Sequence, residues 1–457
     1  MPIHYKNMPK TAPKAAVLFA AFLLLCYNIG AQQELLLHSM PDLWQSGSQN
    51  PALFPKNKKV AVGIAAFALD AYHSNKLSYN DIFVKSGDRT VVDFGNVLSQ
   101  LEPENSVFLD QRIETIQLGF RLPGHWAVQA GHANRLSGKI DYPKTLPELI
   151  WYGNAPYIGQ TVNFGPKANV FDWNEWSIGL SKQIGGLSVG ARLKLLSGIS
   201  ALRTDPDRAT LSVYTDPDIY QLTLQTDYAF HSSSLISAID TAGLGFDLSL
   251  ANLDDRSLFS KNTGVSFDLG AQWQLLDQKL TLDVGILDLG GQINWKENTH
   301  LFQSKASYTY EGTSIPGKDI IDGNTDLDFG AKLDTLNDIF RFNKTEASFS
   351  TQVPLRLYVG GLYKLNSHWT AGLTLFHQRS EEVSRTAVGA NLRWNPLRWV
   401  ALNAMFSAND NNSAMGFGLS LTPGPVQIYF LSDNLFSAFS LKSAPAVNFR
   451  AGAALVF

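Results

Sequence analysis

Hydrophobic and polar residues alternate with a period of two along much of the chain, and the last eleven residues, 447–457, show this most strictly. One register is small or polar and contains Arg450. The other register is apolar and consists of Val447, Phe449, Ala451, Ala453, Leu455 and Phe457. A tilted strand that crosses a bilayer needs about ten such residues, with one face on lipid and one on a lumen. An edge strand of a soluble β-sandwich alternates in the same way, so this segment leaves both classes open.

Short turn sequences join the other alternating segments into successive antiparallel hairpins. These turns fall at 123–124, 185–186, 277–278, 366–367, 395–396 and 423–425. If Val60 to Leu69 is the first strand, every short turn and both termini lie at one end of the sheet. The long connections lie at the other end, at 70–111, 137–172, 231–263 and 290–353. An outer-membrane barrel requires this segregation and a sandwich does not, so the sequence predicts an all-β, transmembrane antiparallel β-barrel.

The number of strands depends on one hairpin, residues 209–228. Inside the barrel wall it gives about sixteen strands, and lifted into an outer loop it leaves about fourteen, both even as in bacterial barrels. We expect fourteen. The aromatic residues nearest the short turns should form a girdle at the bilayer interface. They are Trp126, Trp273, Tyr363, Trp369, Trp394 and Trp399.

The first 31 residues have the pattern of a secretory signal peptide. Lysines precede a short apolar run, 15–26, and Ala31 is the small residue before the expected cleavage site. The run is shorter than the roughly 20 residues of a spanning helix. Cys26, the only cysteine, lies in this segment, so a mature chain that begins at Gln32 has no thiol. Lipid modification of Cys26 is the alternative, and Leu25 before it disfavours that reading.

Charge and motifs exclude several functional classes. The formal net charge of −3 is nearly balanced and gives no support for binding nucleic acid. The chain contains no zinc-protease motif, no nucleophile-elbow motif and no phosphate-binding loop. We therefore expect no enzyme, and neither a cofactor nor a metal.

The polar register of the predicted strands should line the lumen. Its charged candidates for substrate contact are Arg121, Glu175, Arg192, Lys194, Asp268, Asp283, Arg356 and Arg450, and glycine is frequent between them. A basic excess would attract an anionic solute or the carboxylate of an amphipathic one. Charges in a narrow lumen also pair with each other or with a plug, because an isolated buried charge is costly. A purely structural role for these residues is therefore the stronger of the two interpretations.

Residues 32–57, between the signal peptide and the predicted barrel (58–457), are too long and too apolar for an idle tail. They contain Asn50-Pro51-Ala52, which resembles the end of the N-terminal hatch in FadL-type long-chain fatty-acid channels. Segments 151–154, 193–198, 284–291 with Trp295, and 431–434 resemble an uncharacterised family of Gram-negative outer-membrane barrels related to those channels. The resemblance covers essentially the whole mature chain, and its motifs are architectural. It implies a hatch-plugged barrel and suggests lipophilic cargo, and it makes Phe457 part of the signal read by the barrel-assembly machinery.

These observations lead to an expected function and two alternatives. We expect an integral barrel in the bacterial outer membrane that passes small hydrophobic or amphipathic molecules through a plugged lumen. The first alternative is a scaffold or secretion-accessory protein that binds a secreted or surface protein through its extracellular loops, as the related PorV-like barrels imply. The second is a soluble exported β-protein.

Overall fold

The computed structural model describes residues 35–75, 77–86, 89–234, 238–239, 246–247, 258–310, 342–381, 383–409, 413–434 and 446–457. Their dominant feature is one antiparallel sheet that closes into a barrel, because the first strand pairs with the last. Within these residues fourteen strands complete the ring, so the predicted fold class is confirmed. The signal peptide predicted at 1–31 lies outside the described residues.

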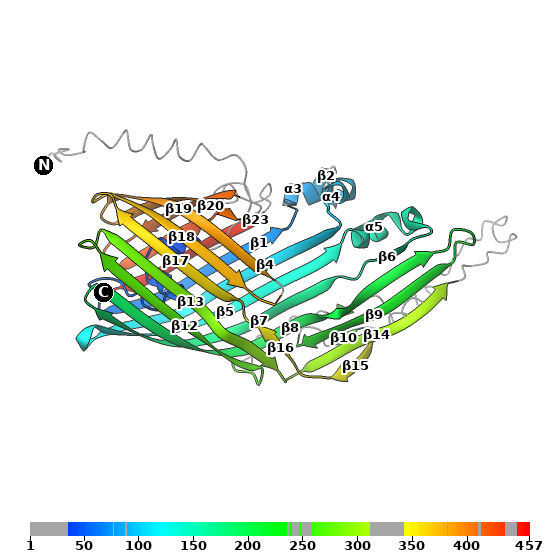
Figure 1. Ribbon diagram of the computed structural model, residues 1–457, viewed down its shortest axis with the longest axis horizontal. Coiled ribbons are helices and arrows are strands. Elements are labelled where there is room, and N and C mark those ends of the chain that lie inside the picture. Colours follow the sequence, from blue (N-terminus) through cyan, green and yellow to red (C-terminus); the bar gives the residue numbers. More distant parts are fainter. Residues whose placement is uncertain are drawn as a thin grey trace.

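The barrel strands follow one another around the ring in chain order (Figure 1). They are β1 (Val60–His73), β4 (Glu104–Leu122), β5 (Trp126–Pro143), β7 (Lys167–Ile184), β8 (Leu187–Thr215), β12 (Thr263–Leu275), β13 (Leu280–Trp295), β17 (Leu355–Lys364), β18 (Trp369–Arg379), β19 (Ser384–Leu397), β20 (Val400–Asn409), β21 (Ser413–Leu421), β22 (Val426–Ser432) and β23 (Ala446–Val456). In the wall β8 pairs directly with β12, so the hairpin that β8 forms with β9 (Leu222–Ser233) stands outside the ring. Fourteen strands rather than sixteen is therefore confirmed.

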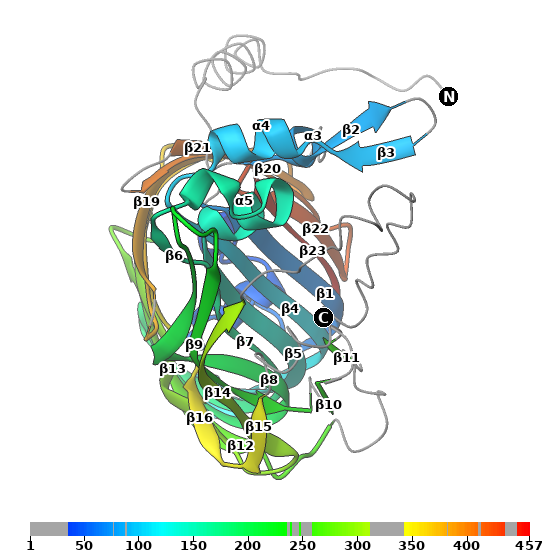
Figure 2. The same ribbon diagram turned by 90° about the vertical axis from the view of Figure 1, so that its right-hand side faces the viewer.

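The two ends of the barrel differ, as the loop lengths predicted. The end that carries the short turns and Phe457 is called the turn end, and the opposite end is called the loop end. At the loop end several strands run far past the barrel and continue as a curved extension of the same sheet, called the extended sheet below, with small helices beside it (Figures 1 and 2). The strands added there are β6 (Thr161–Asn163), β9, β14 (Thr299–Tyr310), β15 (Asn343–Glu346), β16 (Phe349–Gln352) and the pairs β2 (Phe83–Ser86) with β3 (Arg89–Val92) and β10 (Ala238–Ile239) with β11 (Phe246–Asp247).

Short helices complete the described chain. They are α2 (Leu35–His38), η1 (Trp44–Ser48), α3 (Tyr79–Ile82), α4 (Phe94–Gln100), η2 (Pro123–His125), α5 (Thr145–Tyr152) and η3 (Ala155–Tyr157). Among the described residues, no helix has the length and apolar character that crossing a membrane would demand.

All four predicted long connections are partly strand. The stretch 70–111 contains β2 and β3, and the stretch 231–263 contains β10 and β11, each together with the ends of neighbouring strands. The stretch 137–172 begins and ends as continuations of β5 and β7, which pair from Asp141 with Lys167 down to Trp126 with Lys182. The stretch 290–353 contains the end of β13 together with β14, β15 and β16. Beyond the membrane both faces of a strand meet water or other protein, so the alternation that marks a strand inside the bilayer is lost.

The outer face of the barrel is apolar, as the alternation predicted. Large hydrophobic side chains in the outward register are exposed, for example Ile178 at 58%, Phe267 at 51% and Leu373 at 68%. Near the turn end Trp273, Tyr363 and Trp399 are also exposed, which agrees with the predicted girdle. A soluble monomer rarely exposes so continuous an apolar surface. The wall therefore has the character of a lipid-facing surface.

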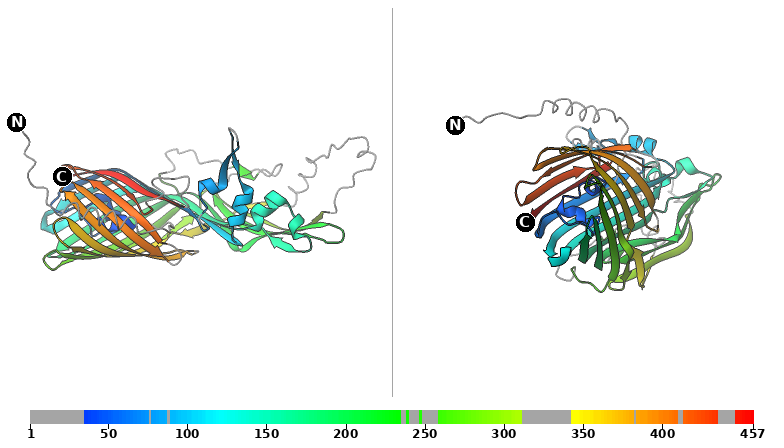
Figure 3. Two further views of the ribbon diagram at one scale, coloured as in Figure 1. Left: turned by 90° about the horizontal axis from the view of Figure 1, so that it is seen from above. Right: turned by 60° about the vertical axis from the view of Figure 1, so that its left-hand side comes forward.

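Residues 35–57 fold back into the lumen instead of leaving the barrel. Figure 3 shows this dark blue segment enclosed by the ring of strands. Leu35, Trp44 and Ala52 along it are each at most 5% exposed. The segment is called the hatch below.

Candidate functional site

A belt of glycines in the inward register forms the seat of the hatch. Gly190, Gly270 and Gly285 are direct neighbours on β8, β12 and β13. A Cβ atom at any of the three would overlap the hatch backbone or side chain between Gln49 and Ala52. The amide of Asn50 donates from Nδ2 to the carbonyl oxygen of Ala271 at 3.1 Å, while its Oδ1 accepts from Ala52 N at 3.0 Å. Glycine is needed here because the hatch backbone lies directly on the wall.

We expect Gly270→Ala to push the hatch away from the wall. The added methyl group meets Asn50 and Pro51, and overpacking of this kind costs about 1–3 kcal/mol. Leakage of a small dye from proteoliposomes and the urea midpoint of unfolding measure the two consequences. Gly361→Ala is the matched control, because a Cβ there meets only Leu282 Cδ2 at 3.4 Å. Equal leakage from the two variants would contradict the seating role.

The beginning of the hatch is buried in an apolar cluster. Leu35, Leu36 and Leu37 are at most 1% exposed and pack with Met40 and Leu43 against wall residues. The wall residues are Leu287, Tyr358, Phe376, Ala387, Ala401, Met405, Tyr429 and Leu431. Burying a leucine side chain contributes about 1.5–3 kcal/mol, so this cluster holds the hatch strongly.

Polar contacts fix the same part of the hatch in one register. His38 stacks on Tyr358, with ring centroids 5.1 Å apart, and its Nε2 lies 2.6 Å from Oδ2 of Asp283. The backbone N–H of Leu36 donates to Oδ1 of Asp433 at 3.1 Å. Asp283 was predicted to line the lumen, and in the structure its carboxylate contacts His38 of the hatch.

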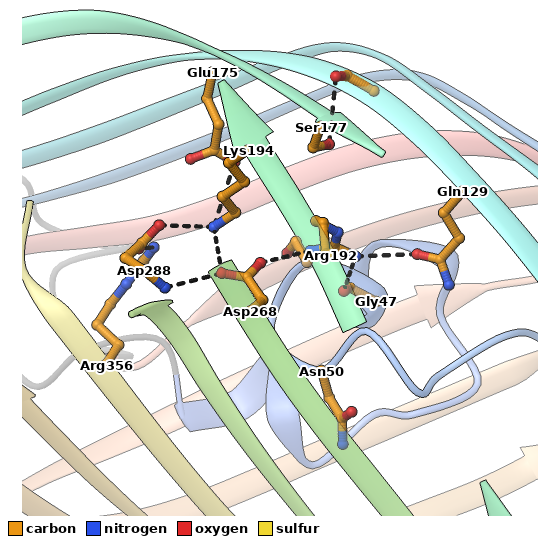
Figure 4. A network of polar contacts seen from close by, with 12 residues as sticks. Gly47, Asn50, Gln129, Glu175, Ser177, Arg192, Lys194, Asp268, Asp288 and Arg356 are labelled. Carbon is orange, nitrogen blue, oxygen red and sulfur yellow. Dashed lines mark hydrogen bonds and ion pairs between the residues drawn. The ribbon is translucent and has the colours of Figure 1, made fainter. Parts of the chain in front are cut away.

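Asp288 is the centre of an ion-pair network between the hatch and the loop end (Figure 4). Its carboxylate forms ion pairs with Lys194 Nζ at 2.7 Å, Arg135 Nη1 at 3.0 Å and Arg356 Nη2 at 2.6 Å. Lys194 also lies 2.9 Å from Asp268, and all of these side chains are at most 7% exposed. The network crosses the lumen, because its members come from β5, β8, β12, β13 and β17.

Glu175, on β7, extends this network toward β4 and β23. Lys194 Nζ lies 3.6 Å and Arg135 Nη1 3.4 Å from its two carboxylate oxygens. The guanidinium of Arg112 lies 3.3 Å from Glu175 and 3.0 Å from Glu114, so it connects the two carboxylates. Arg450 lies 3.9 Å from Glu114. The buried charges therefore form one connected set, which offsets the cost of removing each from water.

Arg192 connects the network to the hatch. Its guanidinium lies 3.2 Å from Asp268 and donates from Nη2 to the carbonyl oxygen of Gly47 at 2.6 Å and to Oε1 of Gln129 at 3.0 Å (Figure 4). Gln129 in turn donates to the carbonyl oxygen of Leu53 at 2.9 Å. The wall thus binds the hatch at both ends of its central turn.

Near the loop end an aromatic cluster fills the lumen above the network. It contains Trp173 and Trp295, which are fully buried, with Phe171, Leu196, Ala201, Ile293 and Val353. Arg135 lies over the Trp173 ring at 4.9 Å, so the cluster and the network are in contact. Beside them run two narrow crevices of about 20 and 40 Å³ that share Asp70, Asp110 and Gln378.

The structure brings seven of the eight predicted lumen residues into the interior. Glu175, Arg192, Lys194, Asp268 and Arg356 meet in the network, Asp283 meets the hatch, and Arg450 lies beside Glu114. Arg121 lies apart near the turn end, half-buried, where it donates to the carbonyl oxygens of Lys58 and Pro55.

The residues that the sequence prediction missed are Arg112, Arg135, Asp288 and His38. The inward position of Asp288 was not predicted, because the period-two alternation is broken at this point of β13. Phe267 pairs with Leu289 and Leu269 with Ile286, so Leu287 and Asp288 together face the single residue Asp268. Asp288 has a positive φ of 63°, and its N–H donates to Asp268 at 2.9 Å. A bulge of this kind turns an apparently outward residue inward.

Within the described residues, no group of three His, Cys, Asp or Glu side chains is arranged to hold a metal ion. The charged cluster instead pairs each carboxylate with lysine or arginine. Its arrangement suits holding the lumen shut and contacting a polar group of a solute.

Comparisons with known proteins show where the chain belongs. A model described as a family of unknown function (DUF5723) matches residues 51–433. No curated protein matches the chain. Among solved structures the chain is similar to the Ralstonia pickettii toluene transporter TbuX, with 10% identity and a TM-score of 0.41 over 91% of this chain and 92% of that one. It is also similar to a Pseudomonas aeruginosa FadL homologue, with 10% identity and a TM-score of 0.39 over 94% and 97% of the two chains.

Proposed function

Because the chain belongs to the family of unknown function DUF5723, we propose its function from its own residues. It is an outer-membrane barrel that passes small amphipathic or hydrophobic molecules inward when its hatch is displaced. The turn end then faces the periplasm and the extended sheet at the loop end faces outward, as in barrels with short periplasmic turns. The apolar outer wall and the plugged lumen support this proposal.

The crevice above the hatch carries the proposal, because its lining has two chemical characters. Leu37 of the hatch and Leu69, Leu431 and Phe449 of the wall contribute apolar surface. The same crevice is lined by charged and amide side chains, namely Asp70, Asp110, Arg356, Gln378, Asp433, Asn448 and Arg450. A molecule with a polar head and an apolar body matches both parts. A sugar or a simple ion matches only one.

Displacement of the hatch supplies the mechanism. In the closed state the crevices at the loop end are too narrow for such a molecule. A solute that binds better to a state with the leucines at 35–37 withdrawn shifts the population toward that state. Its apolar body replaces the contacts that the leucines lose, so the apolar cluster is the part of the hatch that must respond to cargo.

We expect Arg192→Ala to raise uptake of small amphipathic molecules by about fivefold or more. The variant loses the charge-assisted hydrogen bond from the wall to Gly47 of the hatch, which contributes about 1.5–3 kcal/mol, and the bond to Gln129, the wall residue that binds Leu53 of the hatch. Uptake of a radiolabelled medium-chain acid by cells that express the barrel measures the effect. A sugar of similar size measures unspecific leakage.

Arg208→Ala is the matched control for this variant. Arg208 forms an ion pair with Asp227 at 2.9 Å on the extended sheet, and it is remote from the hatch in sequence and contacts. Unchanged uptake by a folded Arg192→Ala barrel, equal to that of the Arg208→Ala control, would remove the support for gating by the hatch.

A second candidate function is binding of a protein partner at the loop end, and an exposed apolar surface favours it. Ile150, Trp151 and Tyr152 of α5 are 70%, 53% and 53% exposed, and Ile219 and Tyr220 on the β8–β9 turn are 68% and 66% exposed. The segment that follows α5 binds the end of β8, since the N–H of Gly159 donates to the carbonyl oxygen of Thr215 and Asn154 Nδ2 donates to its hydroxyl, both at 2.8 Å. Under this hypothesis Trp151→Ser with Tyr220→Ser abolishes cross-linking to a surface protein while uptake is unchanged.

A further inference from the structure

The turn end of the barrel has two open pockets, one on each side of the last hatch residues. One has a volume of about 440 Å³ and is lined by Phe54, Lys56 and Arg121 with polar neighbours. The other has a volume of about 350 Å³ and is lined by Lys56, Lys58, Arg393 and Arg398. Both volumes suit a small solute. Lys56 belongs to both pockets, so they form one mouth around the hatch, and this is called the basic mouth.

Cationic side chains outnumber carboxylates in the basic mouth. Its lining residues include Lys56, Lys58, Arg121, Lys182, Arg393 and Arg398. Lys182 lies over the Trp126 ring at 4.6 Å, so its charge is engaged there. The lining contains one carboxylate, Asp42, and Arg393 already pairs with it at 2.9 Å. Lys56, Lys58, Arg121 and Arg398 have no ion-pair partner within the described residues.

Two further observations describe the surroundings of Lys56 and Arg121. Partial burial and the nearby ammonium group of Lys364 lower the pKa of Lys56, while Asp42 acts in the opposite direction. Arg121 is held in place by hydrogen bonds to two backbone carbonyl oxygens and by the Phe54 ring, 4.9 Å from its guanidinium carbon. A fixed guanidinium loses little entropy when it binds a ligand.

Side chains that donate hydrogen bonds surround these cations. The larger pocket is also lined by Asn57, Ser181, Gln183, Ser188, Gln272, Gln274 and Gln278. Amide and hydroxyl donors beside cations are the groups that bind carboxylate and phosphate oxygens. These amide and hydroxyl groups also accept hydrogen bonds, so the preference for an anion comes from the cations beside them.

We propose that the basic mouth is a binding site for small oxyanions, carboxylates or phosphates, on the periplasmic side of the hatch. This inference goes beyond the proposed passage of amphipathic molecules, because binding at the mouth does not require that anything crosses the lumen. The oxyanion has two sources, a free periplasmic solute or the head group of a molecule that has just passed the hatch.

Inorganic phosphate is the first probe, titrated calorimetrically into the full-length mature barrel in nanodiscs of zwitterionic lipid. We expect saturable binding that weakens as the ionic strength rises, because salt screens exposed charges. We expect Lys56→Gln with Arg398→Gln to weaken it at least about tenfold, since two cations near the ligand are lost. Absence of saturable binding by the wild-type barrel would overturn the proposal.

The matched control removes two cations from the loop end. Lys261→Gln with Lys305→Gln changes side chains that are 84% and 76% exposed, and phosphate affinity should stay at the wild-type value. Equal weakening by both pairs would show an effect of net charge and would overturn a local site. Since both pairs of side chains are solvent-exposed or loosely held, the folded barrel is expected in each case.

Acetate and hexanoate distinguish the two sources of the oxyanion. Equal affinities for the two acids assign the site to a free anion. Tighter binding of hexanoate, through the apolar lining at Phe54 and Leu43, assigns it to the head group of an amphipathic molecule. Failure of either acid to compete with phosphate would overturn a common oxyanion site, and none of these outcomes depends on uptake.

Discussion

Deleting residues 35–54 is expected to turn the closed barrel into a leaky one, with the permeability to small hydrophilic solutes rising at least about tenfold, because the barrel wall closes without the hatch while the lumen is filled by it. The wall strands pair with each other all round the ring, from β1 to β23. The deletion removes the leucine cluster and exposes the glycine belt at 190, 270 and 285. Efflux of a small dye from proteoliposomes measures the permeability.

Deletion of the β2–β3 hairpin, residues 83–92, is the matched control, because this pair forms a separate two-stranded sheet at the loop end. Heat-dependent gel mobility verifies that each variant is a folded barrel. A folded hatch deletion that stays as tight as the control would mean that the wall's own charges close the lumen. The ion-pair network at Asp288, and not the hatch, would then be the gate.

Asp288→Asn is expected to destabilise the barrel by about 3–5 kcal/mol, the cost of removing one partner from a buried charge cluster. The substitution leaves Lys194, Arg135 and Arg356 without the carboxylate that lies within 3.0 Å of each. Glu175 and Asp268 offset part of the loss for Lys194, because their carboxylate oxygens lie 3.6 and 2.9 Å from its Nζ. Urea unfolding in lipid vesicles, followed by tryptophan fluorescence, measures the change.

Glu381→Gln provides the control for this prediction. Glu381 pairs with Arg203 at 2.6 Å at the loop end, but the two side chains are 30% and 25% exposed, and pairs of this kind contribute about 0–1 kcal/mol. If both substitutions change the stability by the same amount, the network at Asp288 is not the structural centre of the lumen. If only Asp288→Asn is strongly destabilising, the charges in the lumen are largely structural, as pairing between them predicts.

The structural role of the charges also limits where cargo can be recognised. Lys194 and Arg192 are engaged by three carboxylates and by the hatch, so a solute meets them only after the hatch moves. Arg356 and Arg450 reach the crevice above the hatch as well as the network. These two arginines are therefore the predicted lumen residues with the best access for a polar head group.

Local patterns in the sequence were sufficient to predict the fold and most of the charged residues that line the lumen. Period-two alternation assigned the inward register of Arg192, Asp268 and Arg450 correctly, because a barrel strand has one lipid face and one lumen face along its whole spanning length. The segregation of short and long connections gave the direction of each strand. It left open whether the hairpin 209–228 belongs to the wall, since fourteen and sixteen strands are both even, and the pairing of β8 with β12 places it outside the ring. The Asn50-Pro51-Ala52 element came from the resemblance to FadL-type channels, and in the structure it lies on the glycine belt of the wall.

The limits of alternation have identifiable physical causes. The bulge in β13 places Asp288 in the lumen, and the irregularity between Glu114 and Ile116 in β4 shifts the register beside Arg112. Arg135 lies on a part of β5 near the predicted long connection, where the pattern weakens. His38 belongs to a segment without periodic structure, so nothing local indicates its partner Asp283, 245 positions away.

The sequence by itself thus determined the barrel, its strand directions and the inward side chains of the regularly alternating strand segments, since each depends on neighbours within one strand or one turn. Only the tertiary structure decided which inward charges meet, where the hatch rests and which cations remain at the basic mouth. Those contacts join strands far apart in the chain, and closure of the ring sets their distances. A bulge of one residue is enough to change the partner of a charge, so the pairing is a property of the closed barrel.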